Sequence, residues 1–540
     1  MKSNIQGLIQ YIIVNTSFFP LTYFYRKIYD LSIAVATLLL RRVEGVLTIY
    51  LCRGAAKGEI VYGLSDIDLL VIVNDKEGQS AKERVRATYD KLSRFIPLFG
   101  RGEKGLGLYS ASEFLSLYND YDFYRHWFND GKYSWKLLFG DDVVKALPQL
   151  EDFELYLPAT EELKVWWSHL KGEFTLDFNY PLFKRKYLWY KAISEAAEVY
   201  LFVCHGKNVR SRDAALCEVK NYLAYEHQCH IDKIQGYLRH LTSKEDLIPD
   251  ELMKLFIALV SKTFEETERK VYGDSKGKTA IVNVPASQEL IADSDLADLA
   301  QESEVALSRE PEPYLDSVAL IPQAEFNVDV LDNSDIDSFY LVLVQRNFMP
   351  IEKLKGFLSL FGENSRWQNI EPFIVADGNI ALSLQVANPH HCIKSPRKCP
   401  LFFSLLPERA SKLPGGSVEG SADPIHCYLP PDTFEETIKK RIAKINVMIL
   451  DKNIYKMKTL DFLRFFWGAA RTKLLAHSLQ SNEIHIPLTS RQILEMLLQA
   501  FPENSDWLKG LHTEYTKELL GKENEAYRFF SKSIDLLNHI

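Results

Sequence analysis

Two aspartates stand one residue apart in the segment YGLSDIDLLVIV, just before an unbroken apolar run. Successive side chains of a β-strand point to opposite faces, so Asp66 and Asp68 should point the same way. Neighbouring carboxylates repel each other unless a positive group lies between them. Mg²⁺ meets this need, because it binds one or two carboxylates together with phosphate oxygens and water. The pair therefore predicts a magnesium site for a phosphate-bearing substrate, while the simpler alternative is a turn cap before a strand.

The loop that precedes the aspartates contains residue types that suit a bound phosphate. Gly54 and Gly58 allow close approach of the backbone, and Lys57 supplies positive charge. Gly63 allows the chain to turn just before Ser65. These residues and the two aspartates form one candidate site.

The elements that must position this site are predicted from apolar patterns. Residues 46–52 and 67–73 read as buried strands, residues 80–96 as a helix, and residues 105–110 as a third strand. The segment WKLLFGDDVV closes this region, and from about residue 160 to residue 272 the pattern becomes helical. A small mixed sheet followed by a helical domain is the expected architecture.

The segment CRGAAKGEIVYGLSDIDLLVIV resembles the signature of the nucleotidyltransferase fold superfamily, which includes DNA polymerase beta and the aminoglycoside nucleotidyltransferases. The resemblance is close over this segment and looser over residues 46–150. It implies transfer of a nucleoside monophosphate from an NTP, with ATP expected, to a hydroxyl-type acceptor on a small molecule or a protein. It implies that Asp66 and Asp68 are catalytic and bind Mg²⁺. The residues that it places around the nucleotide are Arg53, Gly54, Lys57, Gly58 and Ser65.

Two departures from the family pattern affect this reading. The Gly-Ser of the family falls either on Arg53-Gly54 or on Gly54-Ala55, so its hydroxyl group is absent, and the charge of Arg53 is a candidate replacement. The family also takes a third carboxylate from the third strand, but GLGLYS contains none. Glu103 is the candidate for this catalytic role, and Glu113 lies just beyond the strand. These losses support an alternative function, a non-catalytic NTP-binding or scaffold protein.

Several features of the first half recur in the second half in the same order. The aspartate pair recurs as Asp335 and Asp337, Ala196-Ala197 recurs as Ala469-Ala470, and the segment around Arg212 resembles that around Arg491. We predict a tandem duplication in which the second copy is degenerate and structural, because no glycine or lysine stands between Pro322 and Asp335. A homodimer fused into one chain would have pseudo-twofold symmetry.

The expected fold class is α+β, a nucleotidyltransferase-like mixed sheet domain followed by a helical bundle, with the pair repeated. The predicted ranges are an N-terminal helical segment at 1–45, a nucleotidyltransferase domain at 46–150, a helical domain at 151–273, an acidic linker at 274–316, a degenerate nucleotidyltransferase-like domain at 317–430 and a C-terminal helical domain at 431–540.

Composition limits the classes of partner. The chain has 540 residues and a net charge of −8, which argues against nucleic acid as the acceptor. Seven scattered cysteines favour a reducing cytoplasm. In the apolar N-terminal segment the longest uncharged stretch near Leu40, Leu31 to Leu40, is well short of the ~20 residues that a membrane span needs, so we expect the segment to be buried or to face a partner.

Overall fold

The computed structural model divides the chain into two compact units. The first comprises Met1–Glu173 and Asp177–Val271, and the second comprises Phe174–Leu176 and Tyr272–Ile540. The residues that the structure describes are 2–272 except 19, 97, 100–104, 121, 175–179, 210, 240, 242 and 244–246, and then 278–282, 315–322, 339–345, 347–362, 370–376, 380–384, 393–394, 425–429, 438–439, 441–443, 445–446, 459–478, 490–519 and 530–539.

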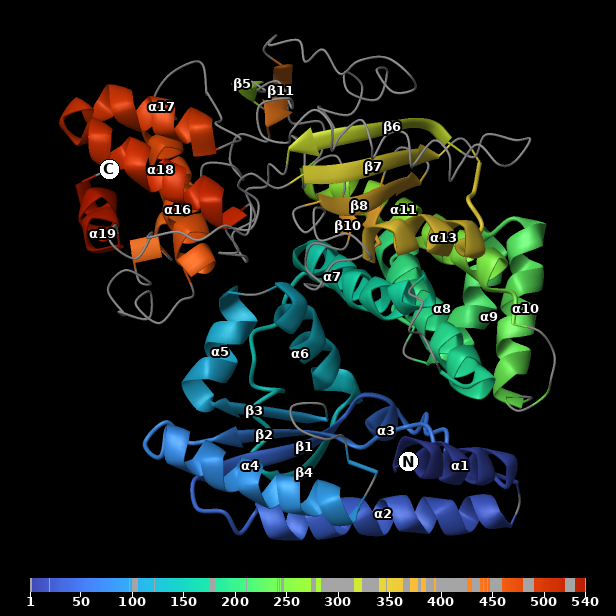
Figure 1. The fold of residues 1–540 in the computed structure, drawn as a ribbon. Coiled ribbons are helices and arrows are strands. Elements are labelled where there is room, and N and C mark those ends of the chain that lie inside the picture. The colour runs from blue at the N-terminus through green and yellow to red at the C-terminus, as the bar shows by residue number, and fades with distance from the viewer. Residues whose placement is uncertain are drawn as a thin grey trace. The chain divides into compact units, whose positions relative to one another are not determined.

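The first unit is built on a four-stranded sheet with the order β3-β2-β1-β4 (Figure 1). Strand β1 (Val46–Cys52) is antiparallel to β2 (Asp68–Val73) and to β4 (Lys136–Gly140). Strand β2 is parallel to β3 (Leu106–Ser110), and this pairing requires a crossover connection, which contains helix α4 (Gly78–Phe95). The three strands and the helix lie close to their predicted positions.

Helices cover both faces of this sheet (Figure 1). Helix α2 (Leu21–Leu40) and α4 pack on one face, and α5 (Ala111–Asp120) and α6 (Asp122–Ser134) pack on the other. Helix α1 (Lys2–Asn15) precedes α2, and the two are joined by a short turn. No helix in the described part of the chain combines the length and the apolar character needed to cross a bilayer.

Strand β2 divides its side chains between the two faces by strict alternation. Leu69, Val71 and Val73 belong to the apolar core formed with α2 and α4. Leu70 and Ile72 belong to the core formed with α5 and α6. Even-numbered residues of β2 therefore face α5 and α6.

A helical domain completes the first unit. Helix α8 is its central element, and most of its residues are buried, which is why its sequence shows little amphipathic character. The elements of this domain are α7 (Asp152–Leu170), η1 (Lys171–Phe174), α8 (Leu182–His205), α9 (Arg212–Val219), η2 (Lys220–Tyr222), α10 (Tyr225–Arg239) and α11 (Pro249–Tyr272).

The second unit contains a five-stranded sheet with the order β10-β9-β8-β7-β6. Strands β6 and β7 are antiparallel, β7 and β8 are parallel, and α13 (Ile351–Gly362) connects the parallel pair. The strand bounds are β6 (Leu315–Pro322), β7 (Phe339–Gln345), β8 (Ile370–Ala376), β9 (Ile380–Ser383) and β10 (Ile393–Lys394).

The range predicted as a linker contains a strand of a second, two-stranded sheet. Strand β5 (Lys278–Val282) lies within the range 274–316 and pairs antiparallel with β11 (Ile425–Leu429). The segment KTAIV is rich in β-branched residues, which favour extended backbone even in an acidic region. Strand β6 also begins at Leu315, just inside the predicted linker.

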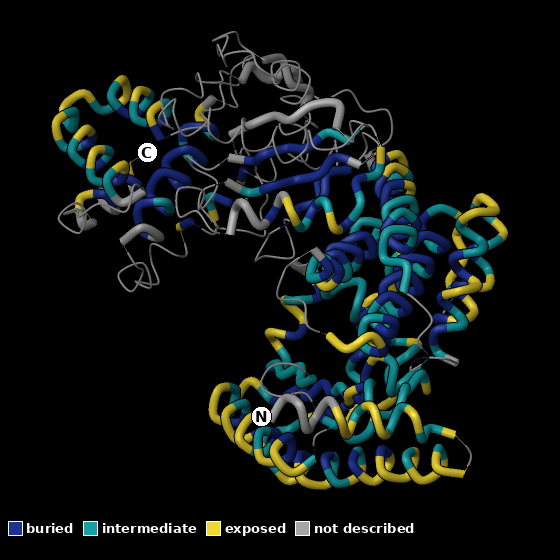
Figure 2. The backbone as a smooth tube through the Cα atoms, turned by 45° about the vertical axis from the view of Figure 1, so that its right-hand side comes forward, coloured by how far each residue is buried: buried dark blue, intermediate teal, exposed yellow. Residues whose placement is uncertain are grey.

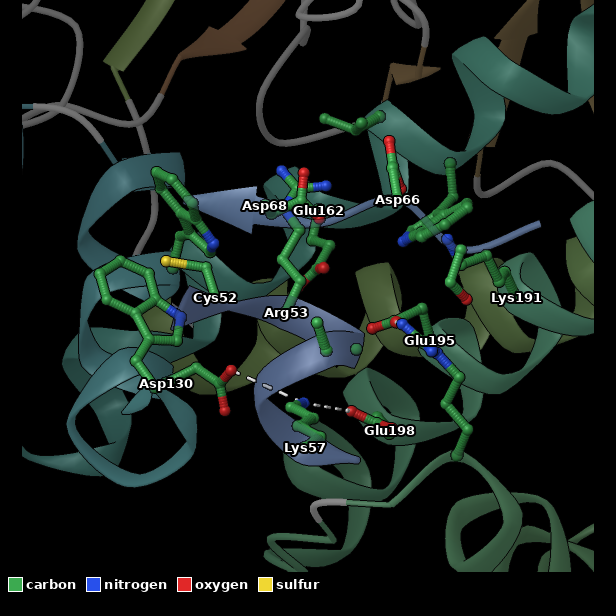
Figure 3. Close-up of a pocket in the computed structure, with 18 of the residues that line it drawn as sticks. Cys52, Arg53, Lys57, Asp66, Asp68, Asp130, Glu162, Lys191, Glu195 and Glu198 are labelled. Carbon is green, nitrogen blue, oxygen red and sulfur yellow. Dashed lines mark hydrogen bonds and ion pairs between the residues drawn. The ribbon is translucent and has the colours of Figure 1, made fainter. Parts of the chain in front are cut away.

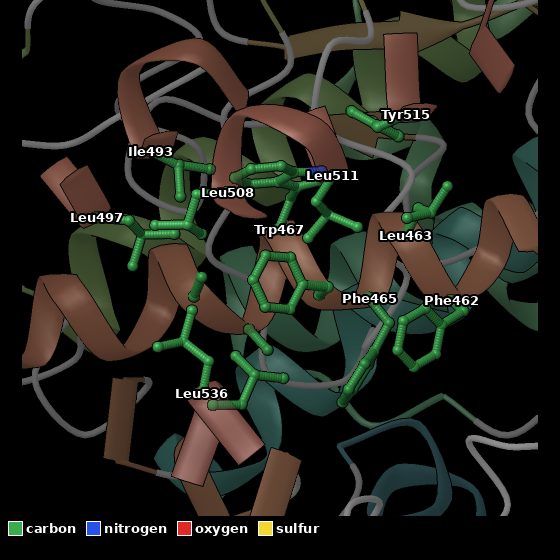
Figure 4. Packing of buried hydrophobic residues seen from close by; sticks show 14 of the residues in the cluster. Phe462, Leu463, Phe465, Trp467, Ile493, Leu497, Leu508, Leu511, Tyr515 and Leu536 are labelled. Carbon is green, nitrogen blue, oxygen red and sulfur yellow. The ribbon is translucent and has the colours of Figure 1, made fainter. Parts of the chain in front are cut away.

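The second unit ends in a helical cluster around a buried apolar core that includes Phe462, Trp467 and Tyr515 (Figure 4). Its elements are α16 (Thr459–Ser478), α17 (Ser490–Ala500), η8 (Pro502–Asn504), α18 (Ser505–Leu519) and α19 (Phe530–His539).

Candidate active site

The two aspartates lie at the start of β2. The backbone is already extended at Ile67, whose N–H donates to the carbonyl of Leu98 at 2.9 Å, and Asp68 pairs with Cys52 of β1. Asp66 and Asp68 alternate with Ile67, which is buried, in the same way as Leu70 and Ile72 alternate with their neighbours. Both carboxylates therefore point to the face of the sheet that α6 covers. Asp66 is exposed and Asp68 is partly buried.

The turn before the aspartates is held by Ser65. Its Oγ accepts a hydrogen bond from the N–H of Val61 at 2.9 Å and lies 2.8 Å from the hydroxyl of Tyr187 in α8. The hydroxyl of Tyr29 in α2 donates to the carbonyl of Ser65 at 2.6 Å. Both hydroxyl partners come from helices far away in the sequence, so the position of Asp66 depends on α2 and α8 as well as on β2.

The segment that leaves β1 forms the short helix α3 (Arg53–Lys57). Arg53 has φ +54°, and among the described residues other than glycine it alone has a positive φ. A left-handed conformation costs an L-residue about 1–2 kcal/mol, and such strain concentrates at functional sites. Gly58 ends the helix with φ +78°. A Cβ on Gly54 would lie 3.3 Å from the carbonyl oxygen of Glu59, so the space beside it is tight.

The aspartates open into a cavity of about 750 Å³ within the first unit (Figure 3). Its walls come from β2, α3, the edge of β3, and helices α6, α7 and α8. Of the residues predicted for the site, those that line the cavity are Arg53, Gly54, Lys57, Ser65, Asp66 and Asp68.

Lys57 forms two ion pairs inside this cavity. Its Nζ lies 3.6 Å from Asp130 Oδ2 in α6 and 3.7 Å from Glu198 Oε2 in α8, as the dashed lines in Figure 3 mark. Burial disfavours the charged amine, but Glu198 and Asp130 outweigh that effect and hold the pKa of Lys57 above its ordinary value. The lysine predicted for phosphate therefore already has carboxylate partners.

A buried arginine cluster lies beside Lys57. The Nε and Nη2 atoms of Arg212 donate to Glu195 Oε1 at 2.9 and 2.7 Å, and Nη1 lies 3.1 Å from Glu59 Oε2. Burial opposes ionisation of Glu195, but Arg212 and Lys57 lower its pKa below the ordinary value. Burial and the charge of Glu195 raise the pKa of Glu198 well above its ordinary value.

The donor set at the strand entrance fits a divalent cation. Burial raises the pKa of Asp68 to about 6, Arg53 opposes this rise, and the neighbouring Asp66 adds to it. A divalent cation would remove the repulsion between the two carboxylates. No cluster of three or more His, Cys, Asp or Glu side chains is arranged to bind a metal in the part of the chain that the structure describes. Two carboxylates suffice for Mg²⁺ only when phosphate oxygens and water complete its shell.

Two other predicted positions are not brought to the cavity. Gly58 ends α3 and is not among the lining residues. Glu113 caps α5, where it accepts a hydrogen bond from the N–H of Ser110 at 2.8 Å, and its other oxygen lies 2.6 Å from Lys82 Nζ. Glu103, Asp335 and Asp337 lie outside the described residues.

The cavity also contains charged residues that lie far from the motif in the sequence. Lys191, Glu195 and Glu198 line the cavity from one face of α8. Their spacing along the sequence is enough to predict that the three charged side chains lie on the same side of a helix. Asp130 and Glu162, on α6 and α7, have no such signal, because only the tertiary fold brings them to the cavity.

No family model matches the chain, and no curated protein matches it in sequence. Among solved structures, a spectinomycin adenyltransferase from Enterococcus faecialis, crystallised with ATP and spectinomycin, is similar at a TM-score of 0.31 and 14% identity. The match covers 44% of this chain and 98% of that chain. A likeness of this size supports no functional conclusion.

Proposed function

We propose that the chain is a nucleotidyltransferase that moves a nucleoside monophosphate from an NTP, ATP in our expectation, to a hydroxyl group on a small molecule or a protein. One observation carries the proposal. Asp66 and Asp68 share a strand face and open into the same cavity as Arg53 and Lys57, so carboxylates for a cation lie together with positive charge for phosphates.

In this proposal Asp66 and Asp68 hold Mg²⁺, which when bound neutralises phosphate charge and aligns the phosphates for displacement. Arg53 lies beside Asp68, where its guanidinium group lowers the pKa of that carboxyl and is available to a phosphate oxygen. Ser65 fixes the turn that presents Asp66. A side chain at Gly54 would crowd the backbone of Glu59, because its Cβ would lie 3.3 Å from that carbonyl oxygen.

Glu198 is our candidate for the group that accepts the proton of the acceptor hydroxyl. It lines the cavity, and its Oε1 is buried without a hydrogen-bond partner among the described residues. A general base works best when its pKa lies near the working pH, and burial raises the pKa of this carboxyl.

The pairing of Lys57 favours a second candidate function. With Asp130 and Glu198 as partners, Lys57 must exchange two ion pairs for a phosphate, which weakens any affinity for a triphosphate. A non-catalytic NTP-binding or scaffold protein could keep this arrangement permanently.

We also propose that the second unit is a degenerate structural copy of the first. The series β1-β2-α4-β3 and β6-β7-α13-β8 have the same order and the same antiparallel and parallel pairings. The series α8-α9-η2-α10-α11 is matched by α16-α17-η8-α18-α19, including the short 3₁₀ turn in the middle. These parallels support a tandem duplication.

The test uses the full chain with Mg²⁺ and each of the four labelled NTPs. Pyrophosphate release or self-labelling should occur in the wild type and be lost in Asp66→Asn/Asp68→Asn. The matched control is Asp335→Asn/Asp337→Asn, which should keep full turnover if the second copy is structural. Mg²⁺-dependent binding of an NTP without turnover would support the non-catalytic function. Equal turnover in the Asp66→Asn/Asp68→Asn variant and the wild type would reject the site.

A further inference from the structure

The N-terminal helices α1 and α2 expose an unusual amount of apolar surface. More than half of the exposed large apolar side chains of the described residues lie between positions 8 and 39. Figure 2 shows much of α2, and of the part of α1 whose burial is described, in the colour of exposed residues. On most folded surfaces such side chains are scattered singly, so a concentration of this kind marks an interaction site.

The exposed apolar residues of α2 form a stripe distinct from its buried face, with the half-buried Val35 between Leu31 and Leu38. Tyr29, Ser32, Ala36 and Leu40 are buried toward the sheet. The residues of the stripe follow one another at helical spacing and remain exposed, with Leu31 65% and Phe24 59% accessible. We call this set the α2 stripe, and its members are Leu21, Phe24, Ile28, Leu31 and Leu38.

Positive charge accompanies the stripe. Residues 1–45 contain five basic and two acidic side chains, a balance of +3 in a chain whose net charge is −8. Arg26, Lys27, Arg41 and Arg42 are all exposed. The segment thus combines exposed aliphatic and aromatic groups with a local excess of positive charge, against the sign of the rest of the chain.

We propose that α1 and α2 dock this protein on the surface of a membrane that contains anionic lipids, with the α2 stripe inserted at the level of the headgroups. Helices of this kind lie in the interface plane when apolar side chains enter the lipid and basic side chains meet anionic headgroups. Neither helix is long and apolar enough to cross the bilayer, which agrees with an interfacial position. Exposed Tyr23 is of the aromatic type enriched at membrane interfaces, and Phe24 is of a type found on the apolar face of interfacial helices.

The same charges disfavour a second copy of the chain as the occupant. An isologous interface places the same patch on both partners, so the basic residues that flank the stripe would face their own copies. Like charges brought together in this way oppose association. A bilayer with anionic headgroups supplies the opposite sign.

The test is co-sedimentation of the full chain with vesicles of phosphatidylcholine alone or with added phosphatidylserine. The wild type should bind the mixed vesicles, and added salt should weaken the binding. Phe24→Gln/Leu31→Gln should lose more than about tenfold in the partition coefficient, because two large apolar groups leave the lipid. Lys27→Gln should lose about fivefold, since one basic residue near an anionic surface contributes about that factor.

The control variant is Phe153→Gln, which removes a 64% exposed aromatic side chain in α7, outside residues 1–45. It should bind like the wild type. Circular dichroism of every variant should match the wild type, because all four positions are on the surface. Absence of binding to mixed vesicles, or equal binding by Phe24→Gln/Leu31→Gln, would overturn the proposal. So would a wild-type dimer that these substitutions convert to a monomer, because the stripe would then be an interface between copies.

Discussion

Replacement of Arg212 by methionine should destabilise the first unit more than any other single change in the cavity wall. The side chain of Arg212 is 7% exposed, and its guanidinium group has two carboxylate partners, Glu195 and Glu59, at 2.7–3.1 Å. Methionine keeps much of the length of the side chain but removes the charge. The carboxylate of Glu195, on the buried side of α8, then loses its principal positive partner.

The loss in the free energy of unfolding depends on how many charged partners remain in each variant. Removing one partner of a buried ion pair costs about 3–5 kcal/mol, and we expect this cost for Arg212→Met. Glu195→Leu leaves Arg212 paired with Glu59, so it should cost only about 1–3 kcal/mol. The double variant removes both buried charges and should cost less than the sum of the two single changes.

The assay is hydrogen exchange of the amides of α8 at increasing urea, which reports opening of this unit rather than of the whole chain. The pH provides a further check. Arg212 and Lys57 lower the pKa of Glu195 against the effect of burial, so its contribution is present above the unfolded-state pKa of about 4.3. This contribution should fade as the pH falls through the folded-state value. A cost below about 1 kcal/mol for Arg212→Met, or strict additivity of the two changes, would refute the reasoning.

Three further predictions concern single positions. Asp68→Asn should stabilise the Mg²⁺-free protein by roughly 1–2 kcal/mol at pH 7, because burial raises the pKa of Asp68 to about 6. In urea unfolding, this gain in stability should disappear as the pH falls toward 4. Arg53→Gly should be about 1 kcal/mol more stable than Arg53→Ala, since both lose the guanidinium group but only alanine keeps the strain at φ +54°; equal melting temperatures would contradict this. Gly140→Ala should cost at least about 3 kcal/mol, because its Cβ would lie 1.8 Å from the carbonyl oxygen of Leu47, whereas Gly78→Ala, with open space around it, should be neutral or stabilising in the same denaturation assay.

The strand-and-turn part of the site could be predicted because its signals are local. Alternation in β2 fixes the direction of Asp66 and Asp68 within a few residues, and the apolar run after them marks the strand. The partners of Lys57 could not be predicted in the same way. Asp130 and Glu198 reach it from α6 and α8, so the state of the lysine depends on helix packing that no short pattern encodes.

The left-handed backbone at Arg53 was also beyond local prediction. Most residues with positive φ in the described part of the chain are glycines, and sequence reasoning assigns such turns to glycine by default. Here an arginine takes that conformation at the end of β1, beside Asp68. The tandem repeat stays a prediction: the sheets have the orders β3-β2-β1-β4 and β10-β9-β8-β7-β6, and β5 lies within the predicted linker.

Because side chains alternate between the two faces along β2, insertions and deletions near the aspartates should have different effects before the strand and within it. Insertions between Gly58 and Leu64 leave the pleat of β2 unchanged and act instead on contacts of the preceding segment, such as the hydrogen bond from the Val61 N–H to Ser65 Oγ. Deletion of one residue between Asp66 and Leu70 would instead shift the pleat by one position and turn a carboxylate toward α2 and α4, into an apolar core. In a library of single-residue deletions, we therefore expect those between Asp66 and Leu70 to give unfolded or inactive variants.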